Sequence, residues 1–423
     1  MAFPRRHVAT YRRVRDLLNP SVKKFLPYAR QTLDEDDIAS VLKALRSDWL
    51  TTGPLVSSFE QTIGSIISSP NTLACSSGTA ALHLASLALG IGPGDTVIVP
   101  SLTFLATANA AVLSGADVVF CDVDSETGLM GPNHLIDALE KYKEKRPKAV
   151  FPVHLNGQAA NMPAISAIAK QNDLRIIEDA AHALGTSYND KPDKHSVIGE
   201  CRHSDITAFS FHPVKTITTG EGGALSTADA KVLKRARLLR NHGIERDVSA
   251  FEFPDQAFSD EGLPNPWYYE MVEVGLNYRA SDIHCALGLS QLAKLDRFIE
   301  HRSHLVNHYN GALARLSPLV TPIKRMSYSQ TAWHLFVVHI DYIAAGLSRA
   351  KLMNSLQGYG IGTQVHYLPL HLQPYYKRRY GPIQLPGAEQ YYSTALSLPL
   401  HVGMNLEDVE RVADALAASL TNR

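Results

Sequence analysis

The sequence has few cysteines, no net charge and no long apolar run, and each absence excludes a class of protein. Its four cysteines are scattered, without a CxxC pair or metal-ligand spacing, so we expect no metal site and reduced thiols in a cytoplasmic protein. The 41 basic and 41 acidic residues balance, which argues against a nucleic-acid-binding protein. No stretch approaches the roughly 18 to 20 apolar residues of a membrane span, so we expect no membrane partner.

The first 24 residues differ in character from the rest of the chain. They are rich in arginine, poor in acids and lack the continuous apolar segment of a secretory signal. We interpret 1–24 as a disordered or loosely docked basic extension, with a targeting peptide as the alternative. The remaining length suits one large domain and a smaller one, which we predict at 25–285 and 286–423.

Short apolar runs alternate with helical patterns through the larger predicted domain. The runs are almost continuously hydrophobic, as expected for strands buried on both faces, at 96–99, 118–122, 149–153, 175–177, 206–211 and 224–226. Helical patterns separate several of them, at 79–89, 106–113, 135–142 and 163–171. Repeated strand–helix units predict an α/β fold with a largely parallel sheet between helices. Elsewhere we expect helices at 34–46, 56–67, 281–301, 348–356 and 406–420, and a strand at 335–340.

One lysine follows a predicted buried strand in the segment FSFHPVKTITTGEGG, at 209–223. Burial of a charged lysine is costly, and a Schiff base with a carbonyl compound removes the charge. Lys215 is therefore a candidate cofactor-binding residue. Taken alone it also suits the more common alternative, a surface lysine.

Two further segments would complete a site for an aldehyde cofactor. Glu178 and Asp179 end a predicted strand, at the edge where open α/β sheets bind ligands. A carboxylate there either holds the ring nitrogen of pyridoxal phosphate (PLP) or caps a following helix. The segment CSSGTAALHL opens a helix whose free amides suit a phosphate, and Gly78 permits its close approach. Lysine, acid and helix start together predict a PLP site.

These motifs occur in the order found in the DegT/StrS family of sugar aminotransferases, which the chain resembles from about Phe25 to its end. The matching segments are SSGTAALHLA, PSLTFLATANA, IIEDAAHALG, FSFHPVKTITTGEGGA and GLNYRASDIHCALGLSQL. The resemblance implies the fold-type-I PLP aminotransferase architecture, with a mixed, mostly parallel sheet between helices in the large domain and a smaller C-terminal α+β domain. It also implies a homodimer with active sites at the subunit interface.

The resemblance assigns roles to individual residues. Lys215 would carry PLP as a Schiff base and move the proton during transamination, and Asp179 would pair with the pyridine nitrogen. The other implied cofactor contacts are Ser77, Gly78, Thr79, Phe104, Ser210 and, from the partner subunit, Asn277. His182 would act near the ring as a further catalytic residue. The implied substrate contacts are Thr52, His212, His366 and His371.

Within the family, the HPVK, TTGEGG and PWYYEM segments are most similar to the aminotransferases of pseudaminic acid biosynthesis. This similarity implies amination at C4 of a UDP-linked 4-keto-6-deoxy-N-acetylhexosamine, with glutamate as donor and 2-oxoglutarate as its product. The alternatives are another nucleotide-linked keto-sugar, a PLP-dependent sugar dehydratase, in which histidine typically replaces the lysine, and a non-catalytic PLP- or sugar-binding regulator. The segment HLNGQAANM departs from the family pattern around its GQ, and a contact between this loop and the sugar would put the substrate in doubt.

Overall fold

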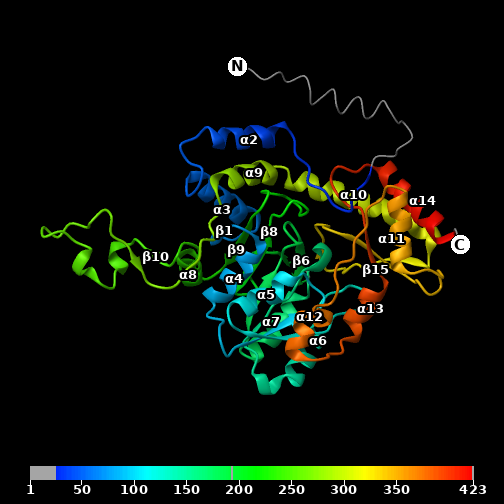
Figure 1. Cartoon of the computed structure of the whole chain (residues 1–423), viewed down its shortest axis with the longest axis horizontal. Coiled ribbons are helices and arrows are strands. Elements are labelled where there is room, and N and C mark those ends of the chain that lie inside the picture. The colour runs from blue at the N-terminus through cyan, green and yellow to red at the C-terminus, as the bar shows by residue number, and fades with distance from the viewer. Residues whose placement is uncertain (1–24, 192–193, 422–423) are drawn as a thin grey trace.

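The computed structural model describes residues 25–191 and 194–421, so the predicted basic extension at 1–24 lies outside the described residues. A sheet covered by helices lies at its centre (Figure 1). This sheet has seven strands in the order β1-β9-β8-β5-β4-β2-β3. These strands are β1 (Thr72–Cys75), β2 (Thr96–Pro100), β3 (Asp117–Cys121), β4 (Ala149–Val150), β5 (Arg175–Asp179), β8 (Ile206–Ser210) and β9 (Gly223–Thr227). All neighbours pair in parallel except β9, which is antiparallel to both β1 and β8. The predicted mixed, mostly parallel sheet is therefore confirmed.

Helices connect the strands of this sheet and pack against it. The helices of the sheet region are α3 (Pro54–Ile66), α4 (Gly78–Ala88), α5 (Leu105–Leu113), α6 (Pro132–Lys141), α7 (Met162–Gln171) and α8 (Ala230–Arg240). α4 packs on β8 and β9 and against α5 and α8, while α3 packs on β1. The strand predicted at 149–153 ends after two residues, because Pro152 has no amide to donate to a neighbouring strand.

The single helix predicted at 281–301 is two helices, α9 (Asp282–Leu292) and α10 (Leu295–Leu313). The backbone leaves the helical conformation at Lys294, whose side chain pairs with Asp37 at 2.9 Å and with Asp34. These acids begin α2 (Glu35–Leu45), which packs along α9. The predicted domain boundary after residue 285 falls inside α9, and the division into two domains stays a prediction.

The C-terminal region contains a small antiparallel sheet in the order β12-β14-β15. Its strands are β12 (Val320–Pro322), β14 (Phe336–Ile340) and β15 (Ala395–Leu398), and its helices are α11 (Arg349–Gly358), α12 (Pro374–Tyr380), α13 (Pro386–Thr394) and α14 (Leu406–Thr421). Another small sheet joins β6 (Ser187–Lys191) and β7 (Lys194–Val197) to β13 (Ser329–Gln330). Of the helices described, none has both the length and the apolar character needed to cross a bilayer.

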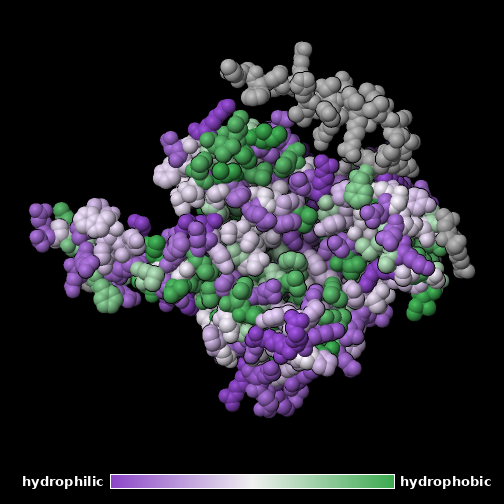
Figure 2. All heavy atoms as spheres, viewed as in Figure 1, coloured by the Kyte–Doolittle hydropathy of each residue, from purple (hydrophilic) through white to green (hydrophobic). Residues whose placement is uncertain are grey.

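Residues 244–276 form an arm that projects away from the rest of the molecule (Figure 1). β10 (Ile244–Glu245) and β11 (Glu270–Met271) pair with each other near its base. The arm exposes large apolar side chains, at Phe253, Trp267, Met271 and Val274. A second apolar surface lies on the outer face of α2, at Ile38, Leu42 and Leu45, where Figure 2 shows a group of hydrophobic residues. Exposed apolar surfaces of this kind mark interaction sites.

Candidate active site

The carboxyl ends of β1, β2, β5 and β8 meet at one edge of the central sheet. β1 runs in the same direction as β8, because each is antiparallel to β9. The segments that follow these strands border a cavity of about 450 Å³. Its lining includes the predicted residues Ser77, Gly78, Thr79, Phe104, Asp179, His182, Ser210, His212, Lys215 and His366. Residues far apart in the sequence are thus brought together at the sheet edge where ligands of open α/β proteins bind.

Lys215 lies in the loop between β8 and β9 and faces the same cavity as Asp179. Its backbone amide donates to the His212 carbonyl at 2.8 Å, which forms a tight turn directly after the strand. Burial lowers the pKa of Lys215 to about 8, although the Asp179 carboxylate acts in the opposite direction. Near neutral pH the uncharged amine is therefore a minor but present form, and it is this form that attacks a carbonyl.

Asp179 ends β5 and is 4% exposed. One carboxylate oxygen accepts a hydrogen bond from the Thr107 hydroxyl at 2.6 Å, and the other accepts one from the Ala181 amide at 3.1 Å. Turns rather than a helix follow Asp179, which excludes the helix-cap alternative. The carboxylate is held by neutral donors, so its charge remains available for a positively charged ring nitrogen. Thr107 was not predicted, and its place in the TFLATANA segment was its only sequence signal.

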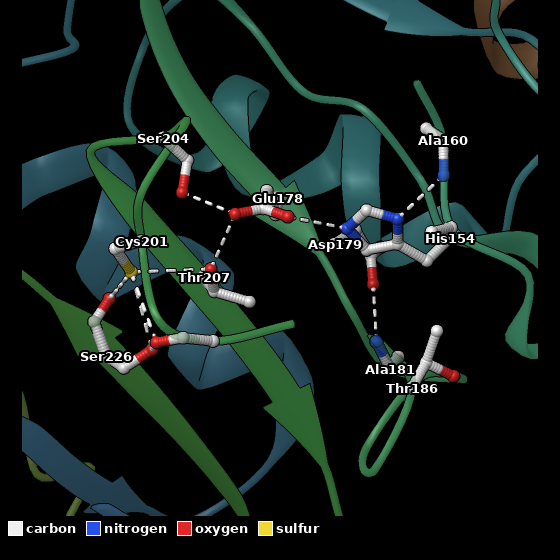
Figure 3. A network of polar contacts seen from close by, with 12 residues as sticks. His154, Ala160, Glu178, Asp179, Ala181, Thr186, Cys201, Ser204, Thr207 and Ser226 are labelled. Atoms are coloured by element: carbon white, nitrogen blue, oxygen red, sulfur yellow. Dashed lines mark hydrogen bonds and ion pairs between the residues drawn. The ribbon is translucent and has the colours of Figure 1, made fainter. Parts of the chain in front are cut away.

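Glu178, the neighbour of Asp179 on β5, lies in a buried polar network (Figure 3). It accepts hydrogen bonds from His154 Nε2 at 2.7 Å, from the Thr207 hydroxyl at 2.8 Å and from the Ser204 hydroxyl. Burial alone would raise the pKa of Glu178, but these donors outweigh it and hold the pKa below its usual value. The network therefore holds β5 in place at the residue next to Asp179.

The segment HLNGQAANM begins at His154 and supports this network. Nδ1 of His154 accepts the Ala160 amide at 3.0 Å, so the ring donates to Glu178 through Nε2. The loop from 154 to 160 is buried and is absent from the lining of the cavity. The loop residues that depart from the family pattern therefore lie behind the cavity wall and do not line the cavity.

The start of α4 lies in the lining of the cavity, with free backbone amides. Ser77 caps the helix, and the backbone amides of Gly78 and Thr79 have no acceptor within the described chain. A Cβ atom on Gly78 would lie 2.7 Å from Cβ of Ser210, so only glycine allows β8 and α4 to approach this closely. Free amides at a helix start suit a phosphate, and the exposed ring of Phe104 is available for stacking on a planar ligand. The residues present therefore fit PLP.

His182 was predicted as a catalytic residue, and the structure places it in the cavity wall. Its Nδ1 accepts the Asn156 amide at 3.3 Å, and its Nε2 lies 3.1 Å from the Tyr367 hydroxyl. Burial and the nearby Lys215 hold the pKa of His182 well below its usual value. With both nitrogens engaged, a neutral His182 is not free to act as a general base. Tyr28, His334 and Tyr367 also line the cavity and were not predicted.

Three predicted residues lie outside the cavity of their own chain. His371 is buried, with its Nδ1 bonded to Ser101 at 2.6 Å and its Nε2 to Glu389 at 3.1 Å, so neither nitrogen is available to a substrate. Thr52 is exposed before α3, and Asn277 is exposed beyond the arm.

The fold and this site define the class of protein. A partly buried lysine with a lowered pKa, a strand-end carboxylate held by neutral donors and an open helix start lie at the ligand-binding edge of a mostly parallel sheet. The chain is a PLP-dependent aminotransferase of fold type I.

Comparisons with known proteins narrow this class. The model of the DegT/DnrJ/EryC1/StrS aminotransferase family matches residues 31–417. The spore coat polysaccharide biosynthesis protein SpsC of Bacillus subtilis (strain 168) is 38% identical over 395 residues, which cover 93% of this chain and 96% of SpsC. The chain therefore belongs to this family and is a sugar aminotransferase.

Solved structures agree with this assignment. Helicobacter pylori PseC, an aminotransferase involved in the biosynthesis of pseudoaminic acid, superposes with a TM-score of 0.83 at 28% identity, covering 95% of this chain and all of PseC. Bacillus subtilis NtdA, solved with bound cofactor PMP, superposes with a TM-score of 0.78 at 27% identity, covering 92% of this chain and 83% of NtdA. PMP is the amine form of PLP, so the cofactor of the family matches the site described above.

Proposed function

We propose that this enzyme transfers the amino group of glutamate to C4 of a UDP-linked 4-keto-6-deoxy-N-acetylhexosamine, and that it does so in the cytoplasm. The cavity that Lys215 and Asp179 share is the observation that carries the proposal. The similarity to PseC, which acts in pseudoaminic acid biosynthesis, supports the sugar. The four unpaired cysteines support the location. When bound, PLP supplies an electron sink that lets the carbon bearing the amino group lose a proton.

The chain's own residues orient the reactants and move the proton. In this proposal the amine of Lys215 would hold the cofactor, and the same amine in its free form would move a proton at the reacting carbon. Asp179 would accept a hydrogen bond from the ring N–H, and the start of α4 would bind the phosphate together with the Ser210 hydroxyl. His212 and His366 line the cavity, where we assign them to the substrate. Because one amine serves as base and acid in turn, one site can process donor and acceptor.

A covalent-trapping experiment tests the central assignment. The protein is mixed with PLP, reduced with borohydride, digested and analysed by mass spectrometry. We expect a phosphopyridoxyl adduct on Lys215 and none in Lys215→Ala. A Lys215→Ala variant that transaminates at the wild-type rate would refute the assignment.

The substrate requires a separate assay. The enzyme is incubated with glutamate and a panel of nucleotide-linked 4-keto-sugars, and product masses identify the acceptor while NMR gives the configuration at the aminated carbon. We expect the UDP-linked 4-keto-6-deoxy-N-acetylhexosamine to give the highest kcat/KM. A higher value for another member of the panel would transfer the proposal to that sugar.

We further propose a homodimer in which Asn277 completes the cavity of the partner subunit. The exposed apolar side chains of the arm and of α2 support an extensive interface, since a monomer rarely leaves so many exposed together. Asn277 is exposed and outside its own cavity, which supports a role across that interface.

Subunit complementation tests this arrangement. Lys215→Ala and Asn277→Ala are each weakly active alone in this proposal, and mixing them yields hybrid dimers. If Asn277 serves the partner, one site of each hybrid is intact, and an equal mixture recovers about a quarter of wild-type activity. If Asn277 served its own chain, no hybrid site would be intact and mixing would restore nothing.

A further inference from the structure

One hydrogen bond and the surroundings of the ring determine which nitrogen of His182 carries its proton. The Asn156 amide donates to Nδ1 at 3.3 Å, so Nδ1 must present its lone pair. The ring is buried beside Lys215, and both conditions keep its pKa well below the usual value. His182 is therefore neutral, and its single proton lies on Nε2.

The direction of the next hydrogen bond follows from this tautomer. Nε2 of His182 lies 3.1 Å from the Tyr367 hydroxyl, so the imidazole donates and the phenolic oxygen accepts. Within the described chain the hydroxyl has no acceptor for its own proton. Tyr367 lines the cavity, and its ring centre lies 5.8 Å from that of Phe104. The adjacent His366 is held by Ser397 at 2.7 Å, which fixes the loop. One oriented O–H donor is thus available to a ligand.

The charge of the cavity limits what this donor can recognise. Among the described residues that line it, Lys215 is the only lysine or arginine. Burial lowers the pKa values of His334 and His366, in the second case to about 3, so both stay neutral. The residues that this chain itself contributes to the cavity therefore offer the carboxylates of an amino donor no guanidinium.

A neutral donor suits a site that must accept two different substrates in turn. An arginine would match the carboxylate of an amino acid, but it would be left buried and unpaired when a neutral sugar ring took the same place. A tyrosine hydroxyl pairs with a carboxylate oxygen or a sugar hydroxyl without leaving a charge behind. Both substrates carry such an oxygen on a carbon next to the reacting carbon.

We propose that Tyr367 donates a hydrogen bond to this neighbouring oxygen, an α-carboxylate oxygen of the amino donor in one half-reaction and a sugar hydroxyl oxygen in the other. His182 is then a positioning residue, because its Nε2–H donates to the phenolic oxygen of Tyr367 and so leaves the hydroxyl proton for the ligand. The Asn156 amide fixes the tautomer of His182. The inference rests on the proposed function, because both substrates are taken from it.

The test is the first half-reaction, which needs glutamate but no sugar. Stopped-flow absorbance follows the conversion of the bound cofactor from its aldehyde to its amine form. Tyr367→Phe removes only the hydroxyl, and we expect kcat/KM for glutamate to fall about 10- to 100-fold, as for loss of one hydrogen bond to a charged group. The cofactor spectrum and the Kd for PLP should be unchanged. Tyr376→Phe is the matched control, since its hydroxyl bonds Asn109 outside the cavity, and it should stay within about twofold of wild type.

A second donor separates substrate recognition from structural damage. n-Butylamine has no carboxylate on its reacting carbon, so Tyr367→Phe should change its slow single-turnover rate by no more than about twofold. Equal losses for both donors, no loss for glutamate, or a Tyr367→Phe protein that cannot retain PLP would each overturn the inference. If the wild-type enzyme itself reacts with no amino acid, the proposed function fails instead.

Discussion

Without its cofactor, the folded enzyme should be destabilised by the buried amine of Lys215. Burial lowers the pKa of Lys215 from 10.5 to about 8. At about 1.36 kcal/mol per pH unit, this difference corresponds to about 3 kcal/mol. Well below pH 8 the Lys215 amine is almost fully charged in both the folded and the unfolded protein, and the folded state then carries nearly the whole cost of burying the charge. Between pH 8 and 10.5 the unfolded chain binds more protons, so stability rises with pH until both forms are uncharged.

Lys215→Met removes the amine at a similar side-chain length and should reverse this effect. At pH 7 we expect the free energy of unfolding of the cofactor-free variant to exceed that of wild type by about 2 to 3 kcal/mol. The gain should shrink from pH 8 upward and vanish near pH 10.5. Chemical denaturation at several pH values measures this difference in the free energy of unfolding. The protein concentration is kept constant, because assembly contributes to stability.

An exposed lysine provides the control for this comparison. Lys170→Met, on the surface of α7, should change the free energy of unfolding by less than about 0.5 kcal/mol at every pH. The reasoning is refuted if Lys215→Met is no more stable than wild type at pH 7, or if its advantage is the same at pH 7 and pH 10.

Three other substitutions probe the shell around the site. Thr107→Val leaves the Asp179 carboxylate with one protein donor and should lower the free energy of unfolding by about 1.5 to 3 kcal/mol, measured by denaturation. Gly78→Ala places a Cβ atom 2.7 Å from Cβ of Ser210, so we expect at least roughly tenfold weaker PLP binding in a fluorescence titration; unchanged affinity would contradict the phosphate assignment. Glu178→Leu leaves a buried imidazole and two hydroxyls without their acceptor and should cost about 3 kcal/mol or more, whereas Glu178→Gln should cost less.

The sequence determined the class of fold and the chemical core of the site. Buried strands that alternate with helices have a strong local pattern, and six predicted strands appear in the central sheet. Short-range patterns also reveal an unusual residue next to a regular element. This is why we could predict Asp179 at the end of β5, Gly78 at the start of α4 and Lys215 in the loop after β8. The same patterns gave no sign that the amphipathic run at 281–301 is interrupted, and the acids that pair with Lys294 at the break lie about 260 positions earlier in the sequence.

Only the tertiary structure decided how these residues cooperate. The support of Asp179 by Thr107, the tautomer of His182 and the free donor of Tyr367 are hydrogen bonds between segments distant in sequence. The same holds for His371, which resembles a substrate contact by its motif but is fully bonded behind the cavity. A sequence pattern records which side chain occupies a position, whereas the direction and availability of each donor depend on the neighbours that folding brings within about 3 Å.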